Sequence, residues 1–143
     1  MHYIHKVQYY ETDQMGIVHH SNYIRWFEEA RSYLLEKIGC GYKQMEEIGI
    51  ISPVLSVCAE YKSMTRFYDE VSVQIRVTAY TGIKITLGYE IRDVKSGEIR
   101  CIGESRHCFL NREGRPVSLK KSYPAFHQIF CGLMENSAPG GRA

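Results

Sequence analysis

Asp13 and His20 are two residues near the N-terminus whose side chains suit acid–base or nucleophilic chemistry. Asp13 lies in a polar, turn-prone stretch, residues 11–16, and His20 follows it by seven positions. A carboxylate, ionised at neutral pH, can serve as a general base or as a nucleophile. Gly16 adopts backbone conformations that other residues resist, which lets the intervening chain fold back. We therefore expect Asp13 to face the segment that begins near His20.

The segment after His20 has the pattern of a helix, whose N-terminus adds a second group to this chemistry. The first N–H groups of a helix lack partners within the helix and lie at the positive end of its dipole, so they suit an oxyanion. The backbone N–H of His20 or Ser21 is the donor that we expect. A carboxylate and such a donor on opposite sides of one carbonyl would suit hydrolysis at that carbonyl, and this arrangement requires no metal or cofactor.

The same residues also have purely structural interpretations. Asp is common in turns, and a histidine at a helix start can cap it or pack against backbone. His19 and His20 are adjacent and therefore diverge, and no third ligand has a suitable spacing, so we expect no metal site. The cysteines are odd in number, widely spaced and outside any recognisable Cys/His setting, which favours reduced, mostly buried thiols. They are Cys40, Cys58, Cys101, Cys108 and Cys131.

The elements that position these residues follow from hydrophobic periodicity. Helical spacing predicts a buried central helix over 22–38, capped by Ser21 or Asn22 and ended by Gly39. Its apolar stripe is Tyr23, Trp26, Phe27, Ala30, Leu34 and Ile38. Glu28 and Arg31 are spaced to form a pair on the helix surface.

Alternating residues predict strands elsewhere in the chain. One strand is expected within residues 1–10, and others over 55–61, 71–79, 83–91 and 99–110. Turns at 81–82 and 95–97 join successive strands, so these strands are antiparallel. Further helices are expected over 42–48 and 122–134, the latter with Pro124 in its first turn.

This order predicts an α+β domain in which a curved antiparallel sheet wraps around one long central helix. We expect residues 1–136 to form a single domain and 137–143 a disordered tail. A sheet of this kind leaves an edge strand, which a symmetric dimer can pair.

Composition limits the partners. The 143 residues carry a net charge of +2, too small to indicate nucleic acid or an anionic membrane. No apolar run approaches the ~20 residues of a membrane span, and the N-terminus lacks the pattern of a secretory signal. We therefore expect a cytoplasmic protein without an integral membrane segment.

Residues 9–23, YYETDQMGIVHHSNY, resemble the signature of the 4-hydroxybenzoyl-CoA thioesterase family. With residues 27–31 and 114–116, they look most like the acyl-CoA thioesterase branch found near the bacterial Tol-Pal genes. The resemblance implies the hotdog fold and hydrolysis of an acyl-CoA thioester. By it, Asp13 matches the essential carboxylate and His20 the histidine at the start of the central helix. Position 19, usually aromatic, is His here, and position 21, often Ala or Pro, is Ser.

The resemblance also implies the surroundings of the site. The substrate is an acyl-CoA or an acyl carrier protein, and the sites lie at the interfaces of a homodimer or homotetramer. Lys84 or Arg66 would meet CoA phosphates, and Tyr61, Lys62 and Met64 would approach the thioester from a neighbouring subunit. The expected substrate-binding residues are Gly16, Val18, His19, Asn22, Tyr23, Tyr61, Lys62 and Lys84.

Two alternatives remain open from the residues. A hotdog hydratase or dehydratase would need a histidine and a carboxylate placed to abstract an α-proton. A non-catalytic module that binds acyl-CoA or acyl carrier protein would not need Asp13. The residues also leave open whether Asp13 acts as a base or as a nucleophile.

Overall fold

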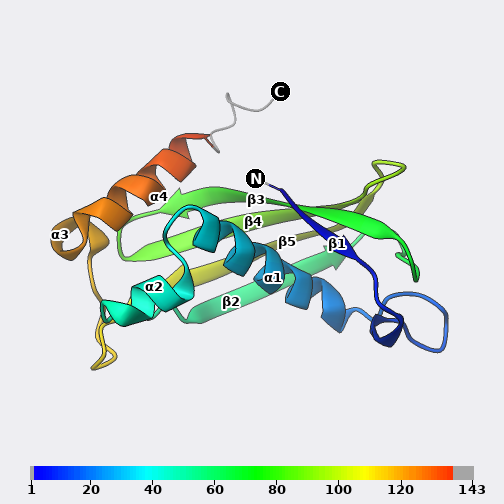
Figure 1. Ribbon diagram of the computed structural model, residues 1–143, viewed down its shortest axis with the longest axis horizontal. Coiled ribbons are helices and arrows are strands. Elements are labelled where there is room, and N and C mark those ends of the chain that lie inside the picture. Colours follow the sequence, from blue (N-terminus) through cyan, green and yellow to red (C-terminus); the bar gives the residue numbers. More distant parts are fainter. Residues whose placement is uncertain (1, 137–143) are drawn as a thin grey trace.

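One antiparallel sheet of five strands forms the base of the molecule (Figure 1). The computed structural model describes residues 2–136. Their strand order is β1-β3-β4-β5-β2, and every neighbouring pair is antiparallel. The strands are β1 (His2–Lys6), β2 (Val54–Tyr61), β3 (Glu70–Tyr80), β4 (Lys84–Asp93) and β5 (Ile99–Cys108). β2 and β1 are thus the two edges.

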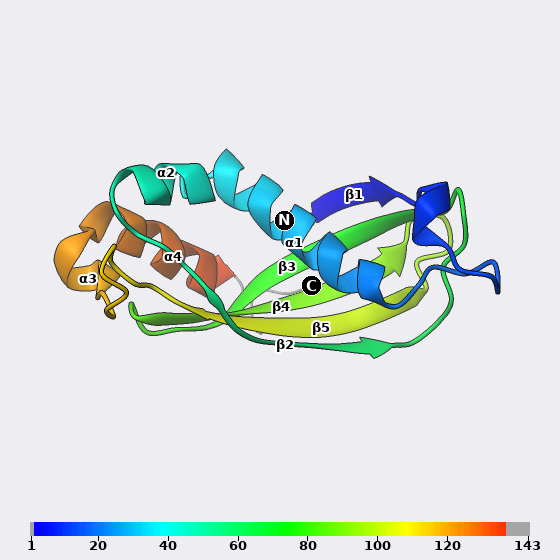
Figure 2. The same cartoon turned by 90° about the horizontal axis from the view of Figure 1, so that it is seen from below.

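The helix α1 (Ser21–Lys37) lies across one face of this sheet (Figures 1 and 2). Its apolar stripe is buried: Trp26, Phe27 and Ala30 have no exposed surface. Phe27 stacks on Tyr89 of β4, with 4.3 Å between the ring centroids. The predicted arrangement, a curved antiparallel sheet around one central helix, is confirmed.

The remaining helices extend this layer beyond the C-terminal end of α1. They are α2 (Tyr42–Glu47), α3 (Leu119–Ser122) and α4 (Pro124–Asn136), and α4 contacts β3. Phe130 of α4 packs against Tyr80 and Phe109. A short 3-10 helix, η1 (Tyr9–Glu11), follows β1 and leads into the Asp13 turn.

Several predicted boundaries differ from the structure. The first strand ends at Lys6, because η1 takes up residues that we had assigned to it. The predicted last helix, 122–134, is observed as α4, Pro124–Asn136, and the short helix α3 precedes it without having been predicted. The N-cap position of α1 is His20, and its side chain makes no capping hydrogen bond, so the predicted cap at Ser21 or Asn22 is wrong. The predicted tail, 137–143, lies outside the described residues.

Two predictions about burial also need correction. Cys40 and Cys101 are buried, but Cys58 is exposed and the other two cysteines are half-buried. Arg31 is not a surface residue: it is buried and hydrogen-bonds two tyrosines, while Glu28 lies 3.8 Å away. Within residues 2–136, no helix is long and apolar enough to cross a membrane.

Candidate active site

A hollow of about 640 Å³ opens where the N-terminus of α1 meets the end of β2. Its lining includes Asp13, Val18, His20, Tyr23, Tyr61 and Lys62. The fold therefore brings six of the ten predicted site residues into one cavity. His19, Asn22, Gly16 and Lys84 are not part of its lining.

Asp13 is held by a tight turn that leaves part of its carboxylate unengaged. Oδ1 accepts a hydrogen bond from the Met15 N–H at 2.8 Å, and the Asp13 N–H donates to the Ile17 carbonyl at 2.9 Å. Gly16 closes the turn with φ of +77°, a conformation that favours glycine. No residue in the described part of the chain donates to Oδ2. Asp13 thus has its structural role in the turn and retains an oxygen for chemistry.

At the start of α1, one backbone N–H has no acceptor in the part of the chain that the structure describes. The His19 N–H donates to the Glu11 carbonyl at 2.9 Å, and the Ser21 N–H to His19 Nδ1 at 3.2 Å. The Asn22 N–H donates to the His19 carbonyl at 3.0 Å. Only the His20 N–H among these four has no acceptor within residues 2–136. Of the two donors considered from the sequence, the geometry therefore favours His20.

His19 and Asn22 hold this geometry rather than line the hollow. The His19 ring bonds the Ser21 hydroxyl at 2.9 Å. The buried Asn22 amide donates to the carbonyls of Glu11 at 2.9 Å and His19 at 3.3 Å. Because Glu11 precedes the Asp13 turn, Asn22 joins that turn to the first turn of α1.

Glu11 is a residue that the sequence reasoning missed. It is buried, and its carboxylate accepts hydrogen bonds from the Gln8 N–H at 2.7 Å and Trp26 Nε1 at 2.7 Å, with His5 Nε2 at 2.9 Å. Burial alone would raise the pKa of Glu11, but these hydrogen bonds outweigh it and hold the pKa below its ordinary value. Glu11 therefore ties β1, η1 and α1 together beneath the Asp13 turn.

Two tyrosines form one wall of the hollow. The Tyr61 hydroxyl donates to the His20 carbonyl at 3.2 Å, and its ring lies 5.3 Å from that of Tyr23. The Tyr23 hydroxyl donates to Thr65 at 3.0 Å. These contacts fix the start of α1 against the end of β2, and with it the free N–H of His20.

The cations of the hollow differ in their partners. Lys62 pairs with Glu60 at 2.8 Å, and Arg100, which the sequence reasoning missed, pairs with Asp93 and Glu98. Arg66 also lines the hollow, and no carboxylate of the described chain lies within 4.0 Å of its guanidinium.

Lys84 lies at the opposite end of the sheet. It pairs with Cys108 and shares a separate hollow with Tyr80 and Arg106. Arg92, at the Asp13 end of the same strand, is eight residues away, or roughly 26 Å at ~3.3 Å per residue. Within one chain, Lys84 therefore does not line the Asp13 hollow, and its expected contact with CoA phosphates stays a prediction.

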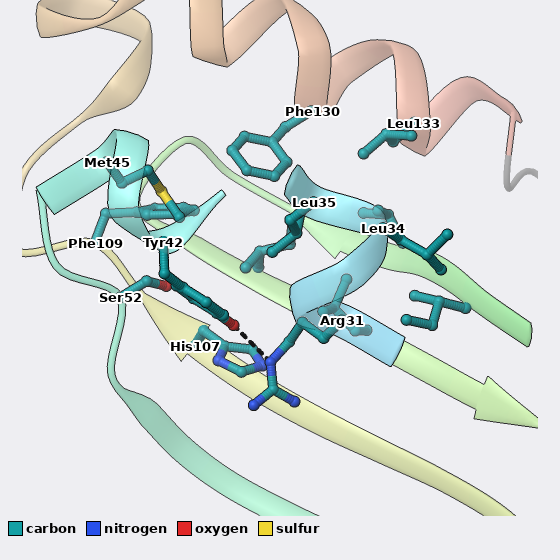
Figure 3. Close-up of a pocket in the computed structure, with 14 residues that line it drawn as sticks. Arg31, Leu34, Leu35, Tyr42, Met45, Ser52, His107, Phe109, Phe130 and Leu133 are labelled. Carbon is teal, nitrogen blue, oxygen red and sulfur yellow. Dashed lines mark hydrogen bonds between the residues drawn. The ribbon is translucent and has the colours of Figure 1, made fainter. Parts of the chain in front are cut away.

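Arg31 lies beside a second, smaller cavity of about 30 Å³, under the C-terminal half of α1 (Figure 3). Arg31 donates to the hydroxyls of Tyr42 at 2.6 Å and Tyr89 at 2.9 Å. From Tyr89, hydrogen bonds of 2.6 and 2.7 Å continue through Ser105 to His107. Burial lowers the pKa of His107 to about 4, so this histidine is neutral at physiological pH.

Two further observations concern metals and thiols. Within residues 2–136, no three His, Cys, Asp or Glu side chains gather as a metal site would require. One cysteine does have a histidine neighbour, contrary to expectation: Cys131 Sγ lies 3.4 Å from His127 Nε2 on α4.

Comparison with known proteins identifies the family. Residues 7–129 match the model of the thioesterase-like superfamily. The chain belongs to this superfamily. A relative from Bacillus subtilis, named putative acyl-CoA thioesterase YneP, is 34% identical over 126 residues, which cover 87% of this chain and 91% of the relative. A putative esterase from Aquifex aeolicus is 37% identical over 120 residues, covering 83% and 91%.

A solved structure agrees with this membership over almost the whole chain. The 1,4-dihydroxy-2-naphthoyl-CoA (DHNA-CoA) thioesterase of Staphylococcus aureus superposes with a TM-score of 0.89 and 29% identity. The alignment covers 99% of this chain and 95% of that one. The fold is therefore the hotdog fold, in which this family of thioesterases places one long helix against an antiparallel sheet.

Proposed function

We propose that this protein hydrolyses an acyl-CoA thioester to the free acid and CoA, with Asp13 as the catalytic carboxylate. The observation that carries the proposal is that Asp13 and His20 line one hollow, where Asp13 Oδ2 and the His20 N–H have no hydrogen-bond partner within residues 2–136. A carboxylate and an oxyanion donor are the two groups that the chemistry requires. The same reaction is supported by two similar proteins that are named as thioesterases of acyl-CoA esters, YneP and the S. aureus DHNA-CoA thioesterase.

In this mechanism the thioester carbonyl lies between Asp13 and the N-terminus of α1. Asp13 either removes a proton from water, whose oxygen then adds to the carbonyl carbon, or attacks that carbon itself to form an anhydride. The His20 N–H donates to the carbonyl oxygen as negative charge develops there. The C–S bond then breaks, and CoA leaves as a thiol after protonation. In the second route, water hydrolyses the anhydride and restores Asp13.

The first test is release of free thiol from a panel of acyl-CoA esters. Asp13→Asn should retain the fold and lose at least about two orders of magnitude in kcat, since general-base catalysis contributes about 10²–10⁴-fold. Glu113→Gln, which changes an exposed carboxyl group in a surface turn, is the control and should retain wild-type kcat. Equal rates in Asp13→Asn and wild type would exclude Asp13 as the catalytic group.

The identity of the acyl group on the substrate is a separate question. The motif of residues 9–23 supports membership of the 4-hydroxybenzoyl-CoA thioesterase family, in its Tol-Pal-associated branch. The S. aureus structure instead directs attention to a naphthoyl thioester. The panel should therefore contain aromatic, short aliphatic and long aliphatic esters of CoA.

We also propose that the active protein is at least a homodimer joined through the β2 edges. On the far side of β2 from β5, the strand has no partner within residues 2–136. Val54, Leu55 and Val57 of this strand are exposed, as is Tyr61 at its site end. Antiparallel pairing of two β2 strands would cover these side chains and bring the Val54 end of each copy to the Tyr61 end of the other. In that dimer, Lys84 would approach the hollow of the opposite copy.

The two rival functions have less support. A hydratase needs a histidine and a carboxylate placed together to abstract an α-proton. Asp13 and His20 both line the hollow, but no hydrogen bond or ion pair joins their side chains within residues 2–136. A binding module would bind CoA esters, release no thiol and be unaffected by Asp13→Asn. The same thiol assay, combined with a measurement of CoA-ester binding, separates it from the enzyme.

A further inference from the structure

Three exposed aromatic side chains lie together beside the Asp13 hollow, and we call them the aromatic platform: Tyr9, Phe67 and Tyr68. The Phe67 ring centroid is 5.4 Å from that of Tyr9 and 4.2 Å from that of Tyr68. Their exposed fractions are 76%, 39% and 66%, respectively. Contiguous exposed apolar surface of this kind indicates a binding site more often than isolated exposed rings do.

The platform is attached directly to the wall of the hollow. Its two segments, η1 and the loop between β2 and β3, lie side by side in both views (Figures 1 and 2). Two backbone hydrogen bonds join them. The Val7 N–H donates to the Asp69 carbonyl at 2.9 Å, and the Val18 N–H donates to the Thr65 carbonyl at 2.8 Å. Arg66, which lines the hollow, immediately precedes Phe67. A ligand in the hollow can therefore extend onto the platform.

The backbone of Tyr68 supports a functional interpretation of its exposed ring. Its φ is +74°, and Tyr68 is the only non-glycine residue within 2–136 with a positive φ. A bulky residue in this region carries strain, and such strain concentrates at ligand sites. Glycine or asparagine would relieve it, so stability alone does not account for a tyrosine here.

The charges beside the platform select the class of ligand. Lys6 Nζ lies 4.7 Å from the centroid of the Tyr68 ring, and the Arg66 guanidinium has no carboxylate partner in residues 2–136. Arginine presents a planar fork of donors that matches phosphate oxygens. Aromatic side chains stack on nucleobases through their faces. Rings and cations at one surface therefore fit a base that carries phosphate groups.

We propose that the aromatic platform binds the adenine nucleotide end of CoA, with the base on Tyr9, Phe67 and Tyr68 and a phosphate at Arg66. This inference rests on the proposed function for its substrate and deepens it by assigning residues to the nucleotide end of CoA, a part that acyl carrier protein lacks. Both carriers present the thioester on a phosphopantetheine arm, but only CoA carries adenine. The platform would then act in recognition, remote from the reacting carbonyl.

The test compares one acyl group on two carriers, CoA and pantetheine, the latter without a nucleotide. In wild type, kcat/KM should be higher for acyl-CoA. Tyr9→Ala and Tyr68→Asn should each lower the ratio of the two kcat/KM values about five- to tenfold, through KM for acyl-CoA. Asn tolerates the left-handed backbone at position 68, and Tyr68→Phe keeps the ring and should restore the wild-type ratio. Tyr33→Ala, which removes a half-exposed ring on α1, is the control and should leave the ratio unchanged.

A binding measurement separates this inference from the proposed function. Adenosine 3′,5′-bisphosphate should bind wild type in calorimetry, and Tyr68→Asn should bind it at least fivefold more weakly. If this binding is found but no thioester is cleaved, nucleotide binding by the platform is supported and the proposed function is wrong. If acyl-CoA and acyl-pantetheine are cleaved equally and the bisphosphate does not bind, the platform is not a nucleotide site. Platform variants that impair only cleavage of acyl carrier protein thioesters would also overturn it.

Discussion

At the scale of single residues, the contact between Phe27 and Gly103 sets how closely α1 approaches the sheet. Gly103 of β5 lies under the Phe27 ring, which also stacks on Tyr89. A Cβ atom at position 103 would overlap that ring and lie 2.8 Å from the Cys58 carbonyl oxygen. Close packing therefore requires glycine at position 103. The distance of α1 from the sheet that this contact sets also places the first turn of the helix.

Gly103→Ala should destabilise the protein by about 1–3 kcal/mol, the usual cost of inserting a methyl group into a packed core. The measurement is urea unfolding at neutral pH. Gly132→Ala is the control: on helix α4, a Cβ at this position meets no atom within 4 Å. It should stabilise by about 0.5–1 kcal/mol through helix propensity. Equal stability of the two variants would contradict the packing argument.

At the scale of elements, Glu11 links three of them. Its carboxylate bonds His5 of β1, the backbone of Gln8 before η1, and Trp26 of α1. Its backbone carbonyl accepts from the His19 N–H and the Asn22 amide. Because both ends of the Asp13 loop meet at Glu11, its ionised carboxylate stabilises the site as well as the fold.

Stability should therefore depend on the ionisation of Glu11. The pKa of Glu11 in the folded protein is below its ordinary value of 4.5, so the folded protein binds the proton less well than the unfolded chain. Its contribution is present above about pH 4.5 and is lost as pH falls through the folded pKa. Glu11→Gln should lower the free energy of unfolding at pH 7 by about 1–3 kcal/mol, because hydrogen bonds to a charged group are lost.

Unfolding of wild type and Glu11→Gln between pH 7 and pH 3 measures this difference. The gap between the two free energies should shrink as pH falls below 4.5. Glu113→Gln, on an exposed turn, should follow the wild-type curve. A gap that stayed constant over the whole range would show that Glu11 does not act through its charge.

Hydrophobic periodicity in the sequence predicted the helices and strands better than it predicted the site. The predicted helix 22–38 is observed at Ser21–Lys37, because a wide apolar stripe at helical spacing can be buried in one way only. Strict alternation likewise predicted β3 and β4, whose inward residues are buried. For β2 the alternation was equally clear, yet both faces are largely exposed, because α1 covers this edge strand only in part.

At the scale of the whole molecule, the proposed dimer depends on the β2 edge. Val57 lies in the middle of this strand and is 41% exposed. In the proposed dimer it would be buried, so Val57→Lys should place a charge in the interface and dissociate the dimer. Because each hollow would lie beside the interface, thioesterase activity should fall together with dimerisation.

Sedimentation velocity over a range of protein concentrations measures this effect. Val94→Lys is the matched control, since Val94 has a similar exposed fraction, 46%, but lies after β4, away from the β2 edge. It should sediment as wild type does. A wild-type protein that is monomeric at all concentrations would exclude the dimer.

The sequence by itself determined the types of the main elements, their antiparallel order and the placement of Asp13 in a turn before a helix. These features depend on residues close together in the chain: a helical or alternating pattern, and a glycine that permits a tight turn. Tertiary structure decided the rest. Contacts between segments far apart in the sequence set the burial of Glu11 and Arg31 and the exposure of the β2 edge. They also set the distance from Lys84 to Asp13 and the start of α1, where the His20 N–H has no acceptor within residues 2–136. The local pattern carries no information about such contacts, because a residue of the same type can be buried or exposed. Packing of the helix on the sheet decides between the two.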